Sequence, residues 1–130
     1  MAKLTSKQAN ELSGHFLGLA QAIGNFRYNN WDALSKKENK VLGNFQWSIL
    51  NYGEDILALS TNLVLDEVET SLTQIENITT DIKSTIETIS DIPKGINVAA
   101  AIVTLGAAII STNQQAIVDS IKGIADAWNT

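Results

Sequence analysis

The sequence predicts an all-α fold, an antiparallel four-helix bundle with up-down-up-down topology. The chain has 130 residues, with one proline and no cysteine. Apolar side chains recur at spacings of three and four residues along most of its length, which is the period of a helix with one buried face. Four such stretches are joined by short connections, and short connections place consecutive helices antiparallel. A chain of this length forms one domain, residues 1–130, with a core of ordinary size.

The first helix is predicted over residues 5–30. Thr5 and Gln8 have the spacing of a capping box, in which two side chains satisfy backbone N–H groups at a helix start. Paired asparagines at 29 and 30 favour a turn that ends the helix. A line of small residues on this helix predicts close packing against the backbone of another helix. Its members are Gly14, Gly18 and Ala22.

The second and third helices are predicted over residues 35–61 and 63–90. Ser35 and Glu38 form another capping box at the start of the second helix. After Leu63 the apolar stripe shifts by two residues, and acidic residues follow, as is favourable at a helix N-terminus. These two features indicate a break between the helices. One continuous helix of more than fifty residues is the alternative that the pattern leaves open.

The fourth helix is predicted over residues 95–128, after a turn at 91–95 that contains the only proline, Pro93. Its first half holds an uncharged run rich in alanine and glycine at 98–110, where two adjoining apolar stripes leave no polar face. We therefore expect this C-terminal helix to be the most buried, with Gly106 facing the small residues of the first helix. This run is also the candidate interaction or membrane-insertion segment, and its residues are Val98, Ile102, Val103, Leu105, Gly106, Ile109 and Ile110.

The pattern leaves open whether this last helix is interrupted near residues 111–113. Thr112 and Gln115 have the spacing of a capping box, which would start a new helix. The apolar stripe nevertheless continues without a change of phase as far as Trp128, which favours one continuous helix.

Charge and composition argue against several classes of function. The net charge is −5, and residues 54–91 carry nine acidic groups but one basic group, Lys83, so we expect no nucleic-acid-binding surface. His15 is the only histidine and cysteine is absent, which leaves too few residues for the usual metal sites or nucleophile–base pairs. No glycine-rich phosphate loop is present. We expect no metal, no cofactor and no enzymatic activity.

The three tryptophans, Trp31, Trp47 and Trp128, admit more than one interpretation. They would suit a ligand-lined end of the bundle or an interfacial belt at a membrane. Packing at the core and at helix ends explains them equally well.

The sequence predicts a non-enzymatic helical-bundle binding module whose partner is another protein or a second copy of the chain. The two apolar faces of the last helix exceed what three neighbouring helices cover, and the remaining strip would serve association. The N-terminal residues lack the apolar segment of a signal peptide, so we expect a cytoplasmic protein, with leaderless secretion as the alternative.

A second interpretation places the apolar helix in a membrane. The stretch Lys94-Gly-Ile-Asn-Val-Ala-Ala-Ala-Ile-Val-Thr-Leu-Gly-Ala-Ala-Ile-Ile110 is similar in composition to the apolar helix or hairpin of bacterial α-helical pore-forming toxins. The resemblance implies a membrane-active protein that shelters residues 96–118 in its soluble form and releases them into a bilayer. The strictly apolar run at 98–110 is about 20 Å long as a helix. That is shorter than a bilayer core, so the binding module is the preferred interpretation.

Overall fold

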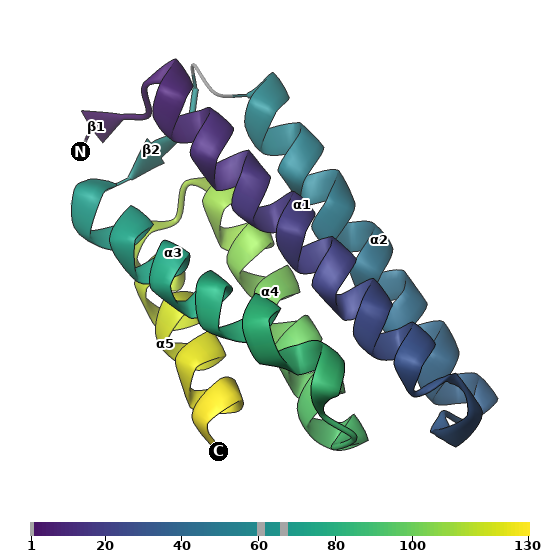
Figure 1. Cartoon of the computed structure of the whole chain (residues 1–130). Coiled ribbons are helices and arrows are strands. Elements are labelled where there is room, and N and C mark those ends of the chain that lie inside the picture. The colour runs from purple at the N-terminus through teal and green to yellow at the C-terminus, as the bar shows by residue number, and fades with distance from the viewer. Residues whose placement is uncertain (1, 60–61, 66–67) are drawn as a thin grey trace.

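The computed structural model describes residues 2–59, 62–65 and 68–130 and is almost entirely helical (Figure 1). The all-α class predicted from the sequence is therefore confirmed. The described residues contain five α-helices, one more than predicted, because the last predicted helix is two helices. The helices are α1 (Ser6–Asn29), α2 (Lys36–Ala58), α3 (Val68–Thr85), α4 (Ile92–Ser111) and α5 (Gln114–Asn129). Two short 3-10 segments are η1 (Trp31–Ala33) and η2 (Ile86–Thr88).

Both predicted capping boxes are present, at the starts of α1 and α2. The Thr5 hydroxyl accepts a hydrogen bond from the backbone N–H of Gln8 at 3.1 Å, and the Gln8 side chain accepts one from the Thr5 N–H at 2.9 Å. Ser35 and Glu38 repeat this exchange at the start of α2. These helix starts are predictable because every group involved lies within four residues of sequence.

The predicted break between the second and third helices is present, and the alternative of one continuous helix is wrong. Helix α2 ends at Ala58; the predicted end at residue 61 lies outside the described residues. The third helix begins at Val68 and not at residue 63, because β2 (Val64–Leu65) is extended and pairs antiparallel with β1 (Ala2–Lys3). The sequence analysis did not predict this strand pair, which ties the start of the chain to the connection between α2 and α3.

Helix α4 begins earlier than predicted and contains the proline that was expected to precede it. Asp91 caps the helix by accepting a hydrogen bond from the Lys94 N–H at 3.1 Å, and Pro93 lies in the first turn. A proline is tolerated there because the first N–H groups of a helix have no partner within the helix. The third predicted helix correspondingly ends early, at Thr85, and continues as η2.

The chain reverses between α4 and α5, so the prediction of one helix over 95–128 is wrong. Thr112 has a left-handed backbone with φ of 56°, and its N–H and that of Asn113 bind the last carbonyl groups of α4. Asn113 then caps α5, accepting from the Ala116 N–H at 3.1 Å. The capping residue is therefore Asn113 and not Thr112, whose hydroxyl donates to the Ser111 carbonyl instead.

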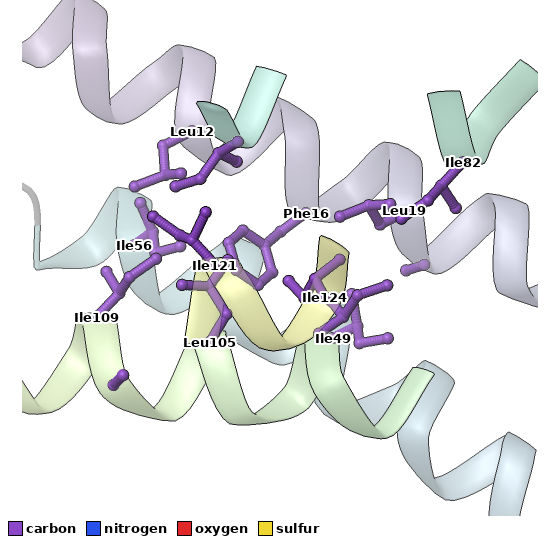
Figure 2. Packing of buried hydrophobic residues seen from close by; sticks show 14 of the residues in the cluster. Leu12, Phe16, Leu19, Ile49, Ile56, Ile82, Leu105, Ile109, Ile121 and Ile124 are labelled. Atoms are coloured by element: carbon purple, nitrogen blue, oxygen red, sulfur yellow. The ribbon is translucent and has the colours of Figure 1, made fainter. Parts of the chain in front are cut away.

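The helices surround one core in which all five take part (Figure 2). Helices α1 and α2 lie side by side along their length and run in opposite directions (Figure 1). Helix α4 packs mainly on α2 and α5, and α3 packs on α1. Phe16 lies at the centre, fully buried. Around it Figure 2 shows Leu12, Leu19, Ile49, Ile56, Ile82, Leu105, Ile109, Ile121 and Ile124.

Candidate interaction surfaces

Helix α4 has an inner face that belongs to the core. Its buried positions recur at three- and four-residue spacings and face α2, α5 and the end of α1. Of the residues singled out in the sequence, five lie on this inner face: Val98, Ile102, Leu105, Gly106 and Ile109. None of their side chains is available for an interaction while the bundle is closed.

Beside the inner face, α4 has a strip that is partly open to solvent and is bordered by the exposed polar residues Asn97 and Thr104. Val103 and Ile110 lie there and are only partly buried, so the expectation that they are enclosed is wrong. The reason is that α4 packs mainly on α2 and α5, and this strip lies outside those contacts. We call this surface the outer face of α4. Its residues are Ile92, Ile96, Ala100, Val103, Ala107 and Ile110.

The small residues on α1 do not have the role that their spacing suggested. A Cβ atom placed on Gly14 would meet nothing within 4 Å, and the Lys83 side chain of α3 lies over Gly18. Ala22 is buried in the core. Gly106 of α4 faces the ring of Tyr52 from α2, so its predicted contact with the glycines of α1 is wrong.

The close approach of α1 to α4 occurs near the start of α4, at a glycine that the sequence analysis did not single out. A Cβ atom on Gly95 would lie 2.2 Å from ring atoms of Phe26, which is fully buried at the end of α1. Helices α1 and α4 have few other contacts, and neither Gly14 nor Gly18 lies against α4.

A groove of about 410 Å³ lies between α1 and α2 on the outside of the bundle. Its lining is mostly apolar, with two glutamines and one arginine. Trp47 and Leu17 at its edge are 64% and 38% exposed, which is high for large apolar side chains. We call this surface the α1–α2 groove. Its lining residues are Leu17, Ala20, Gln21, Arg27, Gly43, Gln46, Trp47 and Leu50.

Two glycines let polar side chains lie flat across this groove. The Arg27 guanidinium of α1 lies over Gly43 of α2, where a Cβ atom would be 3.2 Å from Cζ. In the reciprocal contact, the Gln46 amide of α2 lies over Gly24 of α1, where a Cβ atom would be 2.6 Å from Nε2. Each helix thus places a polar side chain on a glycine of the other. Larger residues at either glycine would displace the side chain above it.

A short repeat in the sequence encodes this reciprocal contact. Residues 24–27 read Gly-Asn-Phe-Arg and residues 43–46 read Gly-Asn-Phe-Gln. Because α1 and α2 are antiparallel, the glycine of each tetrapeptide lies opposite the last residue of the other. This repeat is visible in the sequence as a signal that helical periodicity alone does not reveal.

The three tryptophans have different surroundings. Trp31, in η1, lies under the Arg27 guanidinium, with Cζ 5.3 Å from the ring centroid. Trp47 lines the α1–α2 groove. Trp128, near the end of α5, lies under the Lys94 ammonium of α4 at 4.9 Å. Two of the three rings therefore bind a cation through their faces, an interaction that tolerates partial exposure to water.

His15 of α1 lines a depression between α1 and α3, together with Glu11, Glu69 and Glu76. Partial burial lowers the pKa of His15 below its ordinary value. The nearby Glu76 carboxylate opposes this change in pKa, Lys83 adds to it, and Glu11 opposes it more weakly. Within residues 2–59, 62–65 and 68–130, no group of three or more His, Cys, Asp or Glu side chains is arranged to hold a metal ion.

Comparison of the chain with protein-family models, with curated proteins and with solved structures found no match. Two surfaces of the molecule are open for interaction, the outer face of α4 and the α1–α2 groove.

Proposed function

We propose that the protein is a non-enzymatic binding module that associates through the outer face of α4, with a second copy of itself as the first partner to test. The observation that carries the proposal is the chemistry of that face. Its six residues are apolar, five are partly buried and Ala107 is exposed, and the exposed Asn97 and Thr104 lie beside it. The only charged residue of α4, Lys94, lies away from it over Trp128.

The spacing on the outer face suits contact with another helix. Ile96, Val103 and Ile110 are seven residues apart, with Ala100 and Ala107 between them. A seven-residue repeat of apolar residues keeps one seam facing a partner helix, and alanines in the seam allow the backbones to come close. In this proposal the antiparallel bundle is the scaffold that holds α4 with its inner face covered and its outer face presented.

The test measures the mass of the full-length protein by light scattering over a range of concentrations. We expect the mass to rise with concentration for the parent and to remain that of a monomer for Val103→Asp, because a charge in the seam would be desolvated without a partner. Val118→Asp is the matched control, since Val118 of α5 is 56% exposed and lies off this face. A parent that stays monomeric throughout, or a Val103→Asp variant that associates like the parent, would contradict self-association.

The second candidate function is membrane insertion of α4, and the length of this helix favours it. Helix α4 has 20 residues with a mean hydropathy of 1.6 over an 18-residue window, and 44% of that window is buried. At about 1.5 Å per residue the helix is about 30 Å long, which matches a bilayer core. The strictly apolar run at 98–110 is shorter, because the 20 residues of α4 also include Pro93, Lys94, Asn97 and Ser111.

Insertion requires α4 to leave α2, and a disulfide between the two helices would prevent that. A Cβ atom on Gly106 would lie 2.6 Å from Cγ of Tyr52, so these two positions face each other and a Tyr52→Cys/Gly106→Cys pair would join α4 to α2. The chain has no competing thiol. Membrane insertion predicts dye release from anionic liposomes that stops on oxidation of this variant and returns with reductant. Absence of release by the parent at neutral and acidic pH would rule against insertion by this chain alone.

A further inference from the structure

We propose that the α1–α2 groove binds an amphiphilic carboxylate, a small molecule with an apolar chain that ends in a carboxylate. The proposal concerns a surface separate from the outer face of α4, and it holds whether or not the protein self-associates. It rests on three features of the groove: a fixed arginine, walls without acidic residues, and an exposed apolar floor.

The first feature is the way Arg27 is held. Its Nε donates a hydrogen bond to the Asn39 side-chain oxygen, and its Nη1 donates one to the Gln46 side-chain oxygen at 3.4 Å. The Arg27 guanidinium also lies over the backbone of Gly43 and over the ring of Trp31. The guanidinium is thus oriented by neutral amides and an aromatic ring. In the described part of the chain, no carboxylate pairs with it.

A guanidinium has five N–H donors in a planar fork that fits a carboxylate. The bonds to Asn39 and Gln46 use the Nε donor and one donor of Nη1. The remaining donors, including those of Nη2, are left for a ligand. Because the side chain is already oriented, binding costs little of the rotamer entropy that a free arginine would lose. Charge-assisted bonds to a carboxylate are stronger than bonds between neutral groups.

The second feature is the charge of the groove walls. Residues 12–31 of the α1 region and residues 39–53 of α2 contain no aspartate or glutamate, although the chain as a whole carries 14 acidic residues. The groove walls therefore carry no acidic residue, and Asp32, Glu38 and Glu54 lie just beyond their ends. An acidic ligand is complementary to this surface, while a cationic one is not.

The third feature is the apolar part of the groove. Leu17, Ala20, Leu50 and Trp47 line it beyond the arginine. A ligand chain laid along them would cover apolar area that water now contacts, which is favourable in proportion to that area. The volume of about 410 Å³ falls among small-molecule sites, which span about 300–1,000 Å³. This size favours a small amphiphile over a docked protein helix, which would need a longer apolar surface.

The test is calorimetric titration of the full-length protein with octanoate, octanol and octylammonium, which share one chain and differ in the head group. We expect octanoate to bind at one saturable site, octanol to bind at least about tenfold more weakly, and octylammonium not to bind. Equal binding of octanoate and octanol would overturn the proposal, because the arginine would then contribute nothing. Absence of octanoate binding would overturn it as well.

Two variants locate the site. Arg27→Gln should weaken octanoate binding at least about tenfold. If that variant fails to fold, Trp47→Glu tests the same site. Trp47 is 64% exposed, so its replacement should leave the fold intact, and the new carboxylate should repel octanoate. Leu57→Glu is the matched control: it adds the same charge to an exposed position of α2 outside the groove and should bind octanoate like the parent. Trp47→Glu and Leu57→Glu variants with equal affinity would overturn the assignment to this groove.

Two further outcomes separate this proposal from its alternatives. Val103→Asp should bind octanoate like the parent, so failure of self-association and failure of ligand binding are distinguishable. An acidic amphipathic peptide is the macromolecular alternative for the same groove. Binding of such a peptide that depends on Arg27, in a protein that does not bind octanoate, would replace the proposal with a peptide-binding site.

Discussion

The two helical hairpins of the molecule, α1–α2 and α4–α5, are held together by different kinds of contact. Across α1–α2, the buried Ser13 hydroxyl donates to the Gly53 carbonyl at 2.7 Å, and Arg27 donates to side chains of α2. Between α4 and α5 the contact is largely apolar. At their turn, the N–H groups of Thr112 and Asn113 donate to the last carbonyl groups of α4, and the Lys94–Trp128 contact lies at the other end.

This difference determines what each hairpin can do. Hydrogen bonds are directional, so those across α1–α2 fix the register of the two helices and keep the α1–α2 groove in one shape. Apolar contacts are not directional, and they constrain the position of α4 through packing alone. A preformed ligand site therefore suits α1–α2, whereas association or insertion through an exposed apolar helix suits α4–α5.

The largest expected effect tests whether the inner face of α4 holds the second hairpin in place. Ile102→Asp would bury an unpaired charge at a fully buried position. We expect it to lower the free energy of unfolding by at least about 3 kcal/mol, measured by urea denaturation. Val103→Asp, one residue further on the outer face, is the control and should lose less than about 1 kcal/mol. Equal losses for the two variants would mean that α4 has no open face.

The next effect compares glycines whose surroundings differ. Gly95→Ala places a Cβ against the fully buried Phe26 ring and should cost about 1–3 kcal/mol. Gly106→Ala should cost less, because the Tyr52 ring is only partly buried and has room to move. Gly14→Ala meets nothing and should raise stability by up to about 1 kcal/mol, since alanine is the better helix former. Thermal melting of the three variants checks this order, and a destabilised Gly14→Ala protein would contradict it.

A smaller effect tests the turn of the α4–α5 hairpin. Thr112 has a branched side chain in the left-handed region, which costs roughly 1–2 kcal/mol for a residue other than glycine. Thr112→Gly should therefore raise the free energy of unfolding by about 1 kcal/mol, after allowing for the greater entropy of glycine in the unfolded chain. Urea denaturation measures this difference. A loss of stability would show that the Thr112 hydroxyl contributes more than the backbone strain costs.

The smallest effect compares two buried serines, one in each hairpin. Ser13→Ala removes the hydrogen bond that crosses from α1 to α2 and should cost about 0.5–1.5 kcal/mol. The Ser120 hydroxyl of α5 donates to the Ala116 carbonyl of its own helix, so Ser120→Ala should leave stability nearly unchanged. Both values come from denaturation curves. Equal changes would indicate that the cross-helix bond does not distinguish the hairpins.

The sequence was sufficient for features that depend on neighbouring residues. The capping boxes at Thr5 and Ser35 and the break after α2 belong to this class, because the groups involved lie within a few positions of one another. The sequence around Thr112 allowed both an interrupted and a continuous helix and did not decide between them. The apolar stripe is compatible with both a continuous helix and a hairpin, and only packing of α5 back onto α4 decides between them.

The sequence was not sufficient for features that depend on which helix faces which. Two apolar stripes on α4 do not reveal how many neighbours cover it, so Val103 and Ile110 were wrongly expected inside. Likewise the spacing of Gly14 and Gly18 indicated a line of small residues on α1 but did not indicate which element lies against it. The Gly-Asn-Phe repeat could be read directly from the chain. Its meaning appears only when the antiparallel register places each glycine opposite the other tetrapeptide.

The left-handed Thr112 has a consequence for exchange of segments between copies of the chain. The apolar stripe continues in phase through this residue, so α4 and α5 joined as one straight helix would keep a coherent apolar face and relieve the backbone strain. Straightening would carry α5 away from its own bundle and leave its place open to the α5 of a second molecule. Such domain swapping starts at hinge loops under strain. A closed monomer and a domain-swapped dimer of this protein would therefore differ in the backbone conformation at Thr112.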